Sequence, residues 1–194
     1  MRPFLKWAGN KYQIVERIKA VLPTGERLIE PFVGSGAVFL NKEYPAYQLA
    51  DANNDLINVY QQLQRNGHQF IERCRAYFVA ENNCAEAYYR LRQRFNASAD
   101  LTERAEIFVY LNKHGYNGLC RYNTSGEFNV PFGRYTKPYF PAEEMHFFWQ
   151  RAAKAMFLTA NFTATMQAAM PGDVVYCDPP YVALSATANF TSYS

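Results

Sequence analysis

The chain has 194 residues, of which 49% are hydrophobic and 19% are charged, an ordinary globular composition with room for one domain and a small insertion. It contains no apolar stretch long enough to span a membrane and does not begin with a signal peptide, and these features favour a cytoplasmic protein. The net charge of +3 is too small to establish a nucleic-acid partner, but an equal excess lies in residues 112–141, which contain Lys113, Arg121, Arg134 and Lys137 against Glu127 alone.

The first segment, residues 4–11, reads Phe-Leu-Lys-Trp-Ala-Gly-Asn-Lys and predicts a loop, because its glycine and asparagine tolerate unusual backbone angles. Apolar residues at helical spacing then predict a helix over residues 14–22, which the following proline ends. From this periodicity alone, Trp7 is best interpreted as a core aromatic residue and Lys11 as a solvated charge.

A strand, a glycine turn and a helix are predicted next. Residues 28–29 are apolar, Gly34 and Gly36 follow, and residues 37–40 begin an apolar helix, which is the unit that opens a nucleotide-binding α/β fold. Glycines at such a turn let the backbone approach a cofactor closely. The third glycine of the dinucleotide fingerprint is absent, and this argues against a cofactor with a pyrophosphate group.

Residues 47–51 predict the second strand, with Asp51 at its carboxyl end, 17 positions after Gly34. A doubly wound fold presents an acidic residue at about this place, where its carboxylate can accept hydrogen bonds from two ribose hydroxyls. The alternative is that Asp51 caps the helix that begins near Asn53.

Residues 55–113 have a helical pattern without obvious chemistry, and we interpret them as a helical insertion whose aromatic residues serve packing. The periodicity then breaks. Residues 114–141 interleave glycine turns, basic residues and aromatic residues, a combination that is poor for a core and suited to a nucleic-acid surface. A long aromatic hairpin that packs on the helical insertion is the alternative.

Helix returns over residues 142–154, followed by a strand at residues 157–159 and a short helix that closes at residues 166–170. Residues 174–177 predict a short buried strand that stops at Pro179 and Pro180, since proline cannot donate to a sheet ladder.

This last strand delivers a carboxylate, proline carbonyls and an aromatic ring to the carboxyl end of the sheet. Asp178 and the carbonyl between Pro179 and Pro180 can accept hydrogen bonds from an exocyclic amino group, while Tyr181 can stack on the ring that bears it. Such a cluster suits a planar ring with an amino group. The alternative is a proline-rich turn in which Asp178 is a cap.

The four cysteines, Cys74, Cys84, Cys120 and Cys177, lack the spacing and the nearby histidines of a zinc site. We therefore expect unpaired thiols in a reducing compartment and no metal.

Four motifs in order resemble the Dam-type DNA adenine-N6 methyltransferases, and the resemblance covers essentially the whole chain. Asp-Pro-Pro-Tyr at 178–181 is similar to the catalytic motif of amino-group DNA methyltransferases. Residues 6–11 are similar to the Lys-Trp-x-Gly-x-Lys motif and residues 32–36 to the Phe-x-Gly-x-Gly motif. Residues 115–135 resemble the target-recognition hairpin. The fold this implies is α/β, a Rossmann-like S-adenosylmethionine-dependent methyltransferase sheet with a helical and hairpin insertion.

The resemblance also implies roles for individual residues. The cofactor S-adenosylmethionine would be held by Trp7, Lys11, Phe32, Gly34, Gly36, Asp51 and Asp178. Catalysis would depend on Asp178, Pro179, Pro180 and Tyr181. Duplex DNA would be contacted by Lys6, Tyr116, Asn117, Leu119, Arg121, Pro131 and Arg134.

The activity implied by the resemblance is direct transfer of a methyl group to N6 of an adenine that is turned out of the duplex, with 5′-GATC-3′ as the expected target. We expect a monomer that needs no metal. The alternatives are an RNA or protein amino-group methyltransferase, a protein that binds DNA or cofactor without turnover, and a nicotinamide-dependent oxidoreductase.

We expect three parts in the chain: a cofactor-binding part over residues 1–54, the helical insertion and recognition hairpin over 55–141, and a catalytic part over 142–194. Members of the family continue with further strands and helices beyond Asp-Pro-Pro-Tyr. The sheet is therefore expected to be incomplete at its carboxyl-terminal end, with an unpaired edge and an uncovered apolar face.

Overall fold

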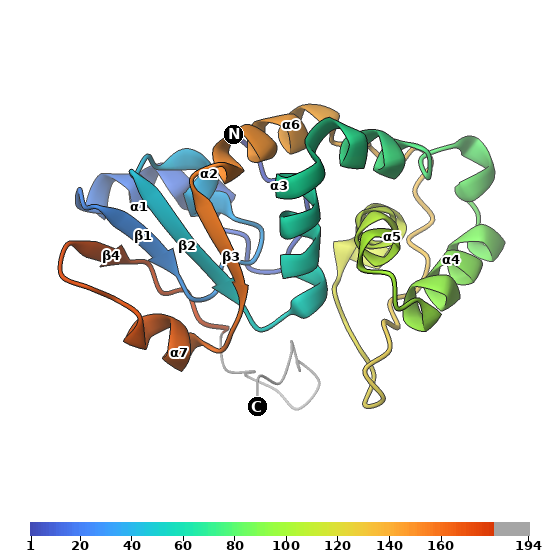
Figure 1. Cartoon of the computed structure of the whole chain (residues 1–194). Helices are drawn as coiled ribbons and strands as arrows, with labels where there is room; N and C mark the ends of the chain where they lie inside the picture. The colour runs from blue at the N-terminus through green and yellow to red at the C-terminus, as the bar shows by residue number, and fades with distance from the viewer. Residues whose placement is uncertain (181–194) are drawn as a thin grey trace.

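The computed structural model describes residues 1–180, in which a parallel sheet stands beside a group of helices (Figure 1). The sheet has four strands in the order β3-β2-β1-β4, and every pairing is parallel. Its strands are β1 (Arg27–Glu30), β2 (Ala46–Asp51), β3 (Ala155–Thr159) and β4 (Asp173–Val175). This confirms the predicted α/β class.

Helices and 3-10 turns connect the strands. They are η1 (Tyr12–Ile14), α1 (Val15–Val21), α2 (Ala37–Asn41), α3 (Asn54–Arg75), η2 (Ala80–Asn82), α4 (Ala85–Ala97), α5 (Leu101–His114), η3 (Tyr116–Gly118), α6 (Ala142–Ala152) and α7 (Phe162–Gln167).

An aromatic core covers one face of the sheet. Phe39 of α2, Tyr60 of α3 and Phe148 of α6 surround Phe157 of β3, with ring centroids 5.4 to 6.2 Å from it. Burial of such large rings supplies much of the hydrophobic driving force for folding. The three helices therefore hold the sheet through one shared cluster.

The opposite face is less completely covered in residues 1–180. Because side chains alternate along a strand, Met156 and Val175 point to this face, and they are 57% and 37% exposed. The helix α7 packs nearby through Phe162, whose ring stacks on Phe32 with centroids 5.5 Å apart. The expected apolar face is thus present in the described part of the chain.

The boundaries of two elements differ from those predicted from the sequence. The strand expected at residues 174–177 is β4 over Asp173–Val175, and it is not fully buried, because β1 is its only strand neighbour among residues 1–180. The helix expected to close at 166–170 is α7, which ends earlier, at Gln167; its start is fixed by Asn161, whose side chain accepts a hydrogen bond from the Ala164 N–H.

Helix α3 links the sheet to the helical unit. Its Gln64 side chain donates to the carbonyls of Ala152 and Ala155 at 2.6 and 2.8 Å, while its other side packs on α5. The division expected at residue 54 falls where this helix begins and stays a prediction. Figure 1 shows α3 between the sheet and the helices α4 and α5.

The predicted hairpin is present but irregular. Two isolated antiparallel bridges, Gly115 with Phe132 and Tyr122 with Phe128, hold it together. Its turn contains Gly126, whose φ of 76° lies in the left-handed region. In Figure 1 the hairpin, drawn in yellow, projects toward the same end of the molecule as the carboxyl ends of the strands.

Gly67 produces the kink in α3, with φ 46° and ψ −121°, and a Cβ there would lie 2.3 Å from the Trp149 ring. We predict that Gly67→Ala lowers the free energy of unfolding by at least about 2 kcal/mol, through backbone strain and overpacking. Gly126→Ala is the matched control, since its φ is also positive but nothing lies within 4 Å of the new Cβ. Equal losses in the two variants by urea denaturation would contradict a role for the Trp149 contact.

Candidate active site and nucleic-acid surface

The carboxyl ends of three neighbouring strands bring acidic side chains to one end of the sheet. Glu30 is the last residue of β1 and Asp51 is the last residue of β2, while Asp178 follows shortly after β4. Because β1 pairs in parallel with both neighbours, these ends lie side by side. This is where open α/β sheets bind their ligands.

The glycine turn follows β1 and is closed by the amino-terminal loop. Gly34 and Gly36 have φ values of 47° and 72°, in the left-handed region that favours glycine, while the close approach of a cofactor to this turn stays a prediction. A Cβ on Gly34 would lie 2.9 Å from the Trp7 ring. Trp7 is half-buried: it packs against the hydrophobic core and also lines the turn. The interpretation as a core aromatic residue is therefore only part of its environment.

Asp51 is tied to the same turn. Its Oδ2 accepts from the Gly34 N–H at 3.1 Å and its Oδ1 accepts from the Asn53 N–H at 2.9 Å. The N-cap of α3 is Asn53, whose side chain accepts from Leu56, so the alternative that Asp51 caps this helix is wrong. Asp51 is 3% exposed, and burial raises its pKa.

Glu30 is a site residue that the sequence analysis missed. It is 2% exposed, and its Oε1 has no hydrogen-bond partner among residues 1–180. Burial raises the pKa of this carboxyl to about 8, the Phe39 N–H partly opposes the rise, and the nearby Asp178 adds to it. The signal in the sequence was a glutamate directly after a buried strand and before the glycine turn.

Lys11 and Asp178 form an ion pair across this end of the sheet. Lys11 Nζ lies 2.7 Å from Asp178 Oδ2, and the two side chains are 17% and 21% exposed. Lys11 Nζ also donates to the Gly9 carbonyl at 2.8 Å. The interpretation of Lys11 as a solvated charge is therefore wrong, because the ion pair draws it over the carboxylate.

The amino-terminal loop also meets the recognition segment. Lys6 Nζ lies 4.0 Å from the centroid of the Tyr135 ring, a cation–π contact, and Tyr135 Oη accepts from the Asn117 N–H at 3.0 Å. Asn117 has a φ of 52°, and Tyr116 beside it is 51% exposed. Tyr135 was not among the predicted DNA contacts, although it ends the hairpin motif.

Asn112 fastens these two segments together and was also missed. Its Oδ1 accepts from the Lys6 N–H at 2.9 Å, and its Nδ2 donates to the Lys6 carbonyl at 2.7 Å. A Cβ on Gly118 would lie 2.3 Å from the Lys6 side chain, so the chains are in direct contact here. No local pattern reveals such a link, because the partners are 106 residues apart.

The hairpin exposes most of its predicted contacts. Arg121, Pro131 and Arg134 are exposed, while Leu119 is partly buried. Arg121 is oriented by Asn129, whose side-chain Oδ1 accepts from Arg121 Nε at 2.7 Å. The hairpin therefore packs on the helices and also presents a basic outer surface, so it combines the two interpretations.

Four further predicted residues are Phe32, Pro179, Pro180 and Tyr181. The Phe32 ring, two residues before Gly34, stacks on Phe162, and its role toward the cofactor stays a prediction. Pro179 and Pro180 are exposed at the tip that follows β4. Tyr181 lies outside the described residues.

Residues 1–180 contain neither a candidate metal site nor a candidate membrane-spanning helix. No group of three or more His, Cys, Asp or Glu side chains there could hold a metal ion. None of the helices in that range is long and apolar enough to cross a membrane.

Comparison with known proteins identifies relatives along nearly the whole chain. Residues 7–194 match the family model of the D12 class N6 adenine-specific DNA methyltransferases. The chain is 54% identical over 192 residues to a DNA adenine methylase of Escherichia coli K12, a match that covers 99% of the chain and 69% of the relative.

Other relatives agree. The identity is 55% over 192 residues with a DNA adenine methylase of Serratia marcescens, covering 99% of the chain and 71% of that protein. It is 51% over 193 residues with a DNA adenine methylase of Vibrio cholerae O1 El Tor, covering 100% of the chain and 70% of that protein.

Glu30 should make stability depend on pH. Its pKa is about 8 in the folded protein and 4.5 in the reference state, so the folded protein keeps a proton that the unfolded chain loses. Stability is therefore full below pH 4.5 and falls as the pH rises toward 8, by about 1.4 kcal/mol per pH unit.

We predict that Glu30→Gln removes this loss, so that the variant gains stability relative to the wild type as the pH rises from about 5 to about 8, measured by urea unfolding across this range. Glu26→Gln, which replaces an exposed carboxylate just before β1, is the control. A stability difference that does not change with pH would contradict a protonated Glu30.

Proposed function

The chain belongs to the D12 class of N6 adenine-specific DNA methyltransferases, and from this membership we propose that it transfers the methyl group of S-adenosylmethionine to N6 of adenine in 5′-GATC-3′ duplexes. The observation that best supports this proposal is the Lys11–Asp178 pair beside the glycine turn and Asp51. It joins the two predicted functional segments, the cofactor loop and the Asp-Pro-Pro-Tyr tip, in one place. The target sequence rests on the similarity of the hairpin motifs.

The site residues fit the cofactor chemically. Glu30 Oε1, which has no hydrogen-bond partner among residues 1–180, is an acceptor suited to the ammonium of the methionine part, and Asp51 is suited to the ribose hydroxyls. Gly34 leaves a space beside the Trp7 ring that a side chain would fill. When bound, S-adenosylmethionine supplies an electrophilic methyl group.

Asp178 and Pro179 would activate the nucleophile. An aromatic amine is a poor nucleophile because its nitrogen lone pair is delocalised into the ring. Hydrogen bonds from N6 to the Asp178 carboxylate and the Pro179 carbonyl favour a localised lone pair and stabilise the positive charge that develops on N6. Asp178 can then accept the proton that N6 loses once the new bond to carbon has formed. Tyr181 would stack on the adenine.

Opening of the Lys11–Asp178 pair would make Asp178 a better acceptor. A lysine ammonium at 2.7 Å occupies one of its two carboxylate oxygens, Oδ2, and withdraws negative charge from the carboxylate. Lys11 can instead pair with the carboxylate of the cofactor, which carries the charge that Asp178 now supplies. Lys11 would then both bind the cofactor and release Asp178.

DNA would lie across the hairpin and the amino-terminal loop. The exposed Arg134 is suited to phosphate, Arg121 to a base edge, and Tyr116 to the gap left by the extruded adenine. Lys6, Asn117, Leu119 and Pro131 would complete this surface. We propose that the protein acts as a monomer, since it modifies one strand at a time.

Methyl transfer tests the function directly. Residues 1–194 are incubated with radiolabelled S-adenosylmethionine and a duplex that contains one GATC site. A matched duplex has the adenine of each strand replaced. Label in the GATC duplex alone is expected; equal label in both would contradict the target, and label in neither would contradict the proposed activity of this chain.

We predict that Asp178→Ala lowers the rate of transfer at least about a hundredfold, as expected when a group that stabilises transition-state charge is removed. Asp178→Asn keeps one oxygen acceptor and should retain more activity than the alanine variant. Single-turnover rates and equilibrium binding of labelled S-adenosylmethionine separate catalysis from folding. Near-normal transfer by Asp178→Ala would overturn the assignment.

A further inference from the structure

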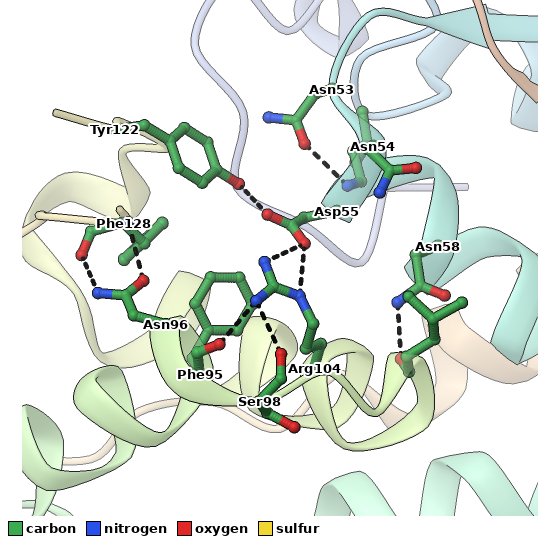
Figure 2. A network of polar contacts seen from close by, with 12 residues as sticks. Asn53, Asn54, Asp55, Asn58, Phe95, Asn96, Ser98, Arg104, Tyr122 and Phe128 are labelled. Atoms are coloured by element: carbon green, nitrogen blue, oxygen red, sulfur yellow. Dashed lines mark hydrogen bonds and ion pairs between the residues drawn. The ribbon is translucent and has the colours of Figure 1, made fainter. Parts of the chain in front are cut away.

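The first arm of the hairpin, residues 119–122, turns alternate side chains toward the protein. Arg121 is exposed, while the phenol of Tyr122 and the thiol of Cys120 point inward. Tyr122 Oη donates to Asp55 Oδ2 at 2.7 Å, and Cys120 Sγ lies 3.4 Å from Asn53 Nδ2. This arm, called the reading arm below, is therefore fastened to the start of α3 (Figure 2).

Asp55 is itself held rigidly from the other side. Its Oδ1 accepts from Arg104 Nε at 3.2 Å and from Nη2 at 2.8 Å, and the two side chains are 11% and 21% exposed. Arg104 Nη1 also donates to the carbonyls of Phe95 and Ser98, which end α4. Figure 2 shows the carboxylate between the guanidinium and the phenol. The anchor of the reading arm is thus fixed by α3, α4 and α5 together.

The same short segment of chain carries the proposed ribose acid. Asp51 accepts from the Gly34 N–H and from the Asn53 N–H, and Asn53 caps α3 two residues before Asp55, which lies in the first turn. Residues 51–55 thus contact the glycine turn at one end and the reading arm at the other. A movement of the glycine turn would therefore be transmitted to the reading arm through these hydrogen bonds.

The second arm of the hairpin has a separate attachment. Asn96 Nδ2 donates to the Phe128 carbonyl at 3.1 Å, and Asn96 Oδ1 accepts from the Phe128 N–H at 2.9 Å. The Tyr122 ring also packs edge-on against Phe128, with centroids 5.7 Å apart. Loss of the Tyr122 hydroxyl alone would therefore leave the hairpin attached to the helices. Only the position of the reading arm relative to α3 would no longer be fixed.

We propose that Tyr122 and Asp55 are a positioning pair that sets the reading arm against the cofactor pocket, so that base discrimination depends on a hydrogen bond that touches neither DNA nor cofactor. The inference rests on the proposed function, because it assumes that Leu119 and Arg121 meet base edges. The inference adds that Asp55 of α3 fixes the position from which the reading arm meets these base edges.

The test compares Tyr122→Phe with Tyr110→Phe. Tyr110 is the control, since its buried phenol also donates one hydrogen bond, in this case to the Asn82 carbonyl at 2.6 Å, in the same helical unit but outside the reading arm. Fluorescence anisotropy gives the affinity of each protein for the GATC duplex and for duplexes with one base pair changed. S-adenosylmethionine is present in one series and absent in another.

Tyr122→Phe is expected to reduce the ratio of cognate to changed-duplex affinity at least about fivefold, while Tyr110→Phe leaves the ratio unchanged. Affinity for S-adenosylmethionine without DNA should stay within about twofold of the wild type, because Asp51 keeps its bonds. An unchanged ratio, or a uniform loss of affinity for every duplex, would overturn the proposal and leave a structural role only.

Hydrogen exchange provides a readout that needs no ligand. The Asn129 N–H donates to the Arg121 carbonyl and should exchange faster in Tyr122→Phe, whereas the Phe128 N–H, held by Asn96, should not. Equal protection of the Asn129 N–H in variant and wild type would overturn the positioning role.

A double-mutant cycle with Asp55→Asn adds a check on the pair. The effects of Asp55→Asn and Tyr122→Phe on discrimination should be less than additive, because both remove the same bond. Additive effects would contradict the pair. If the wild type prefers another target, the proposed GATC specificity fails, yet the comparison of variant with wild type still decides the role of Tyr122.

Discussion

Parallel pairing of β1 with β2 and with β4 is the constraint on which the site depends. It forces Glu30, Asp51 and Asp178 to emerge at the same end of the sheet, although they lie far apart in the sequence. Burial of three carboxyl groups would be costly as charges; Glu30 avoids this cost by keeping its proton, since burial raises its pKa to about 8, whereas Asp51 and Asp178 need compensation. The structure supplies it through the Gly34 and Asn53 N–H groups on Asp51 and through Lys11 on Asp178.

The sequence predicts the features that local patterns encode. The glycine turn, the acid that ends β2, the hairpin and the strand before Asp178 each follow from short segments whose chemistry is visible in the chain. Family resemblance then places these segments in one enzyme. The α/β class and the family assignment are confirmed, while the roles of individual residues remain predictions.

Long-range contacts could not be read in this way. The ion pair of Lys11 with Asp178 and the clamp of Asn112 on Lys6 join distant segments, and only the folded chain brings them together. Glu30 was missed because it stands out through its burial and through an oxygen without a hydrogen-bond partner among residues 1–180, and both are properties of the folded chain. The exposure of β4 likewise depends on its place at the edge of the described sheet.

Two residues near the ends of the hairpin combine backbone strain with side chains suited to recognition. Asn117 and Arg134 adopt φ values of 52° and 54°, where glycine would fit with less strain. Both side chains belong to the surface that we propose for DNA. Selection for stability alone would favour glycine at these two positions, so an effort to make this protein more heat-resistant by relieving backbone strain would remove two side chains of the proposed DNA surface.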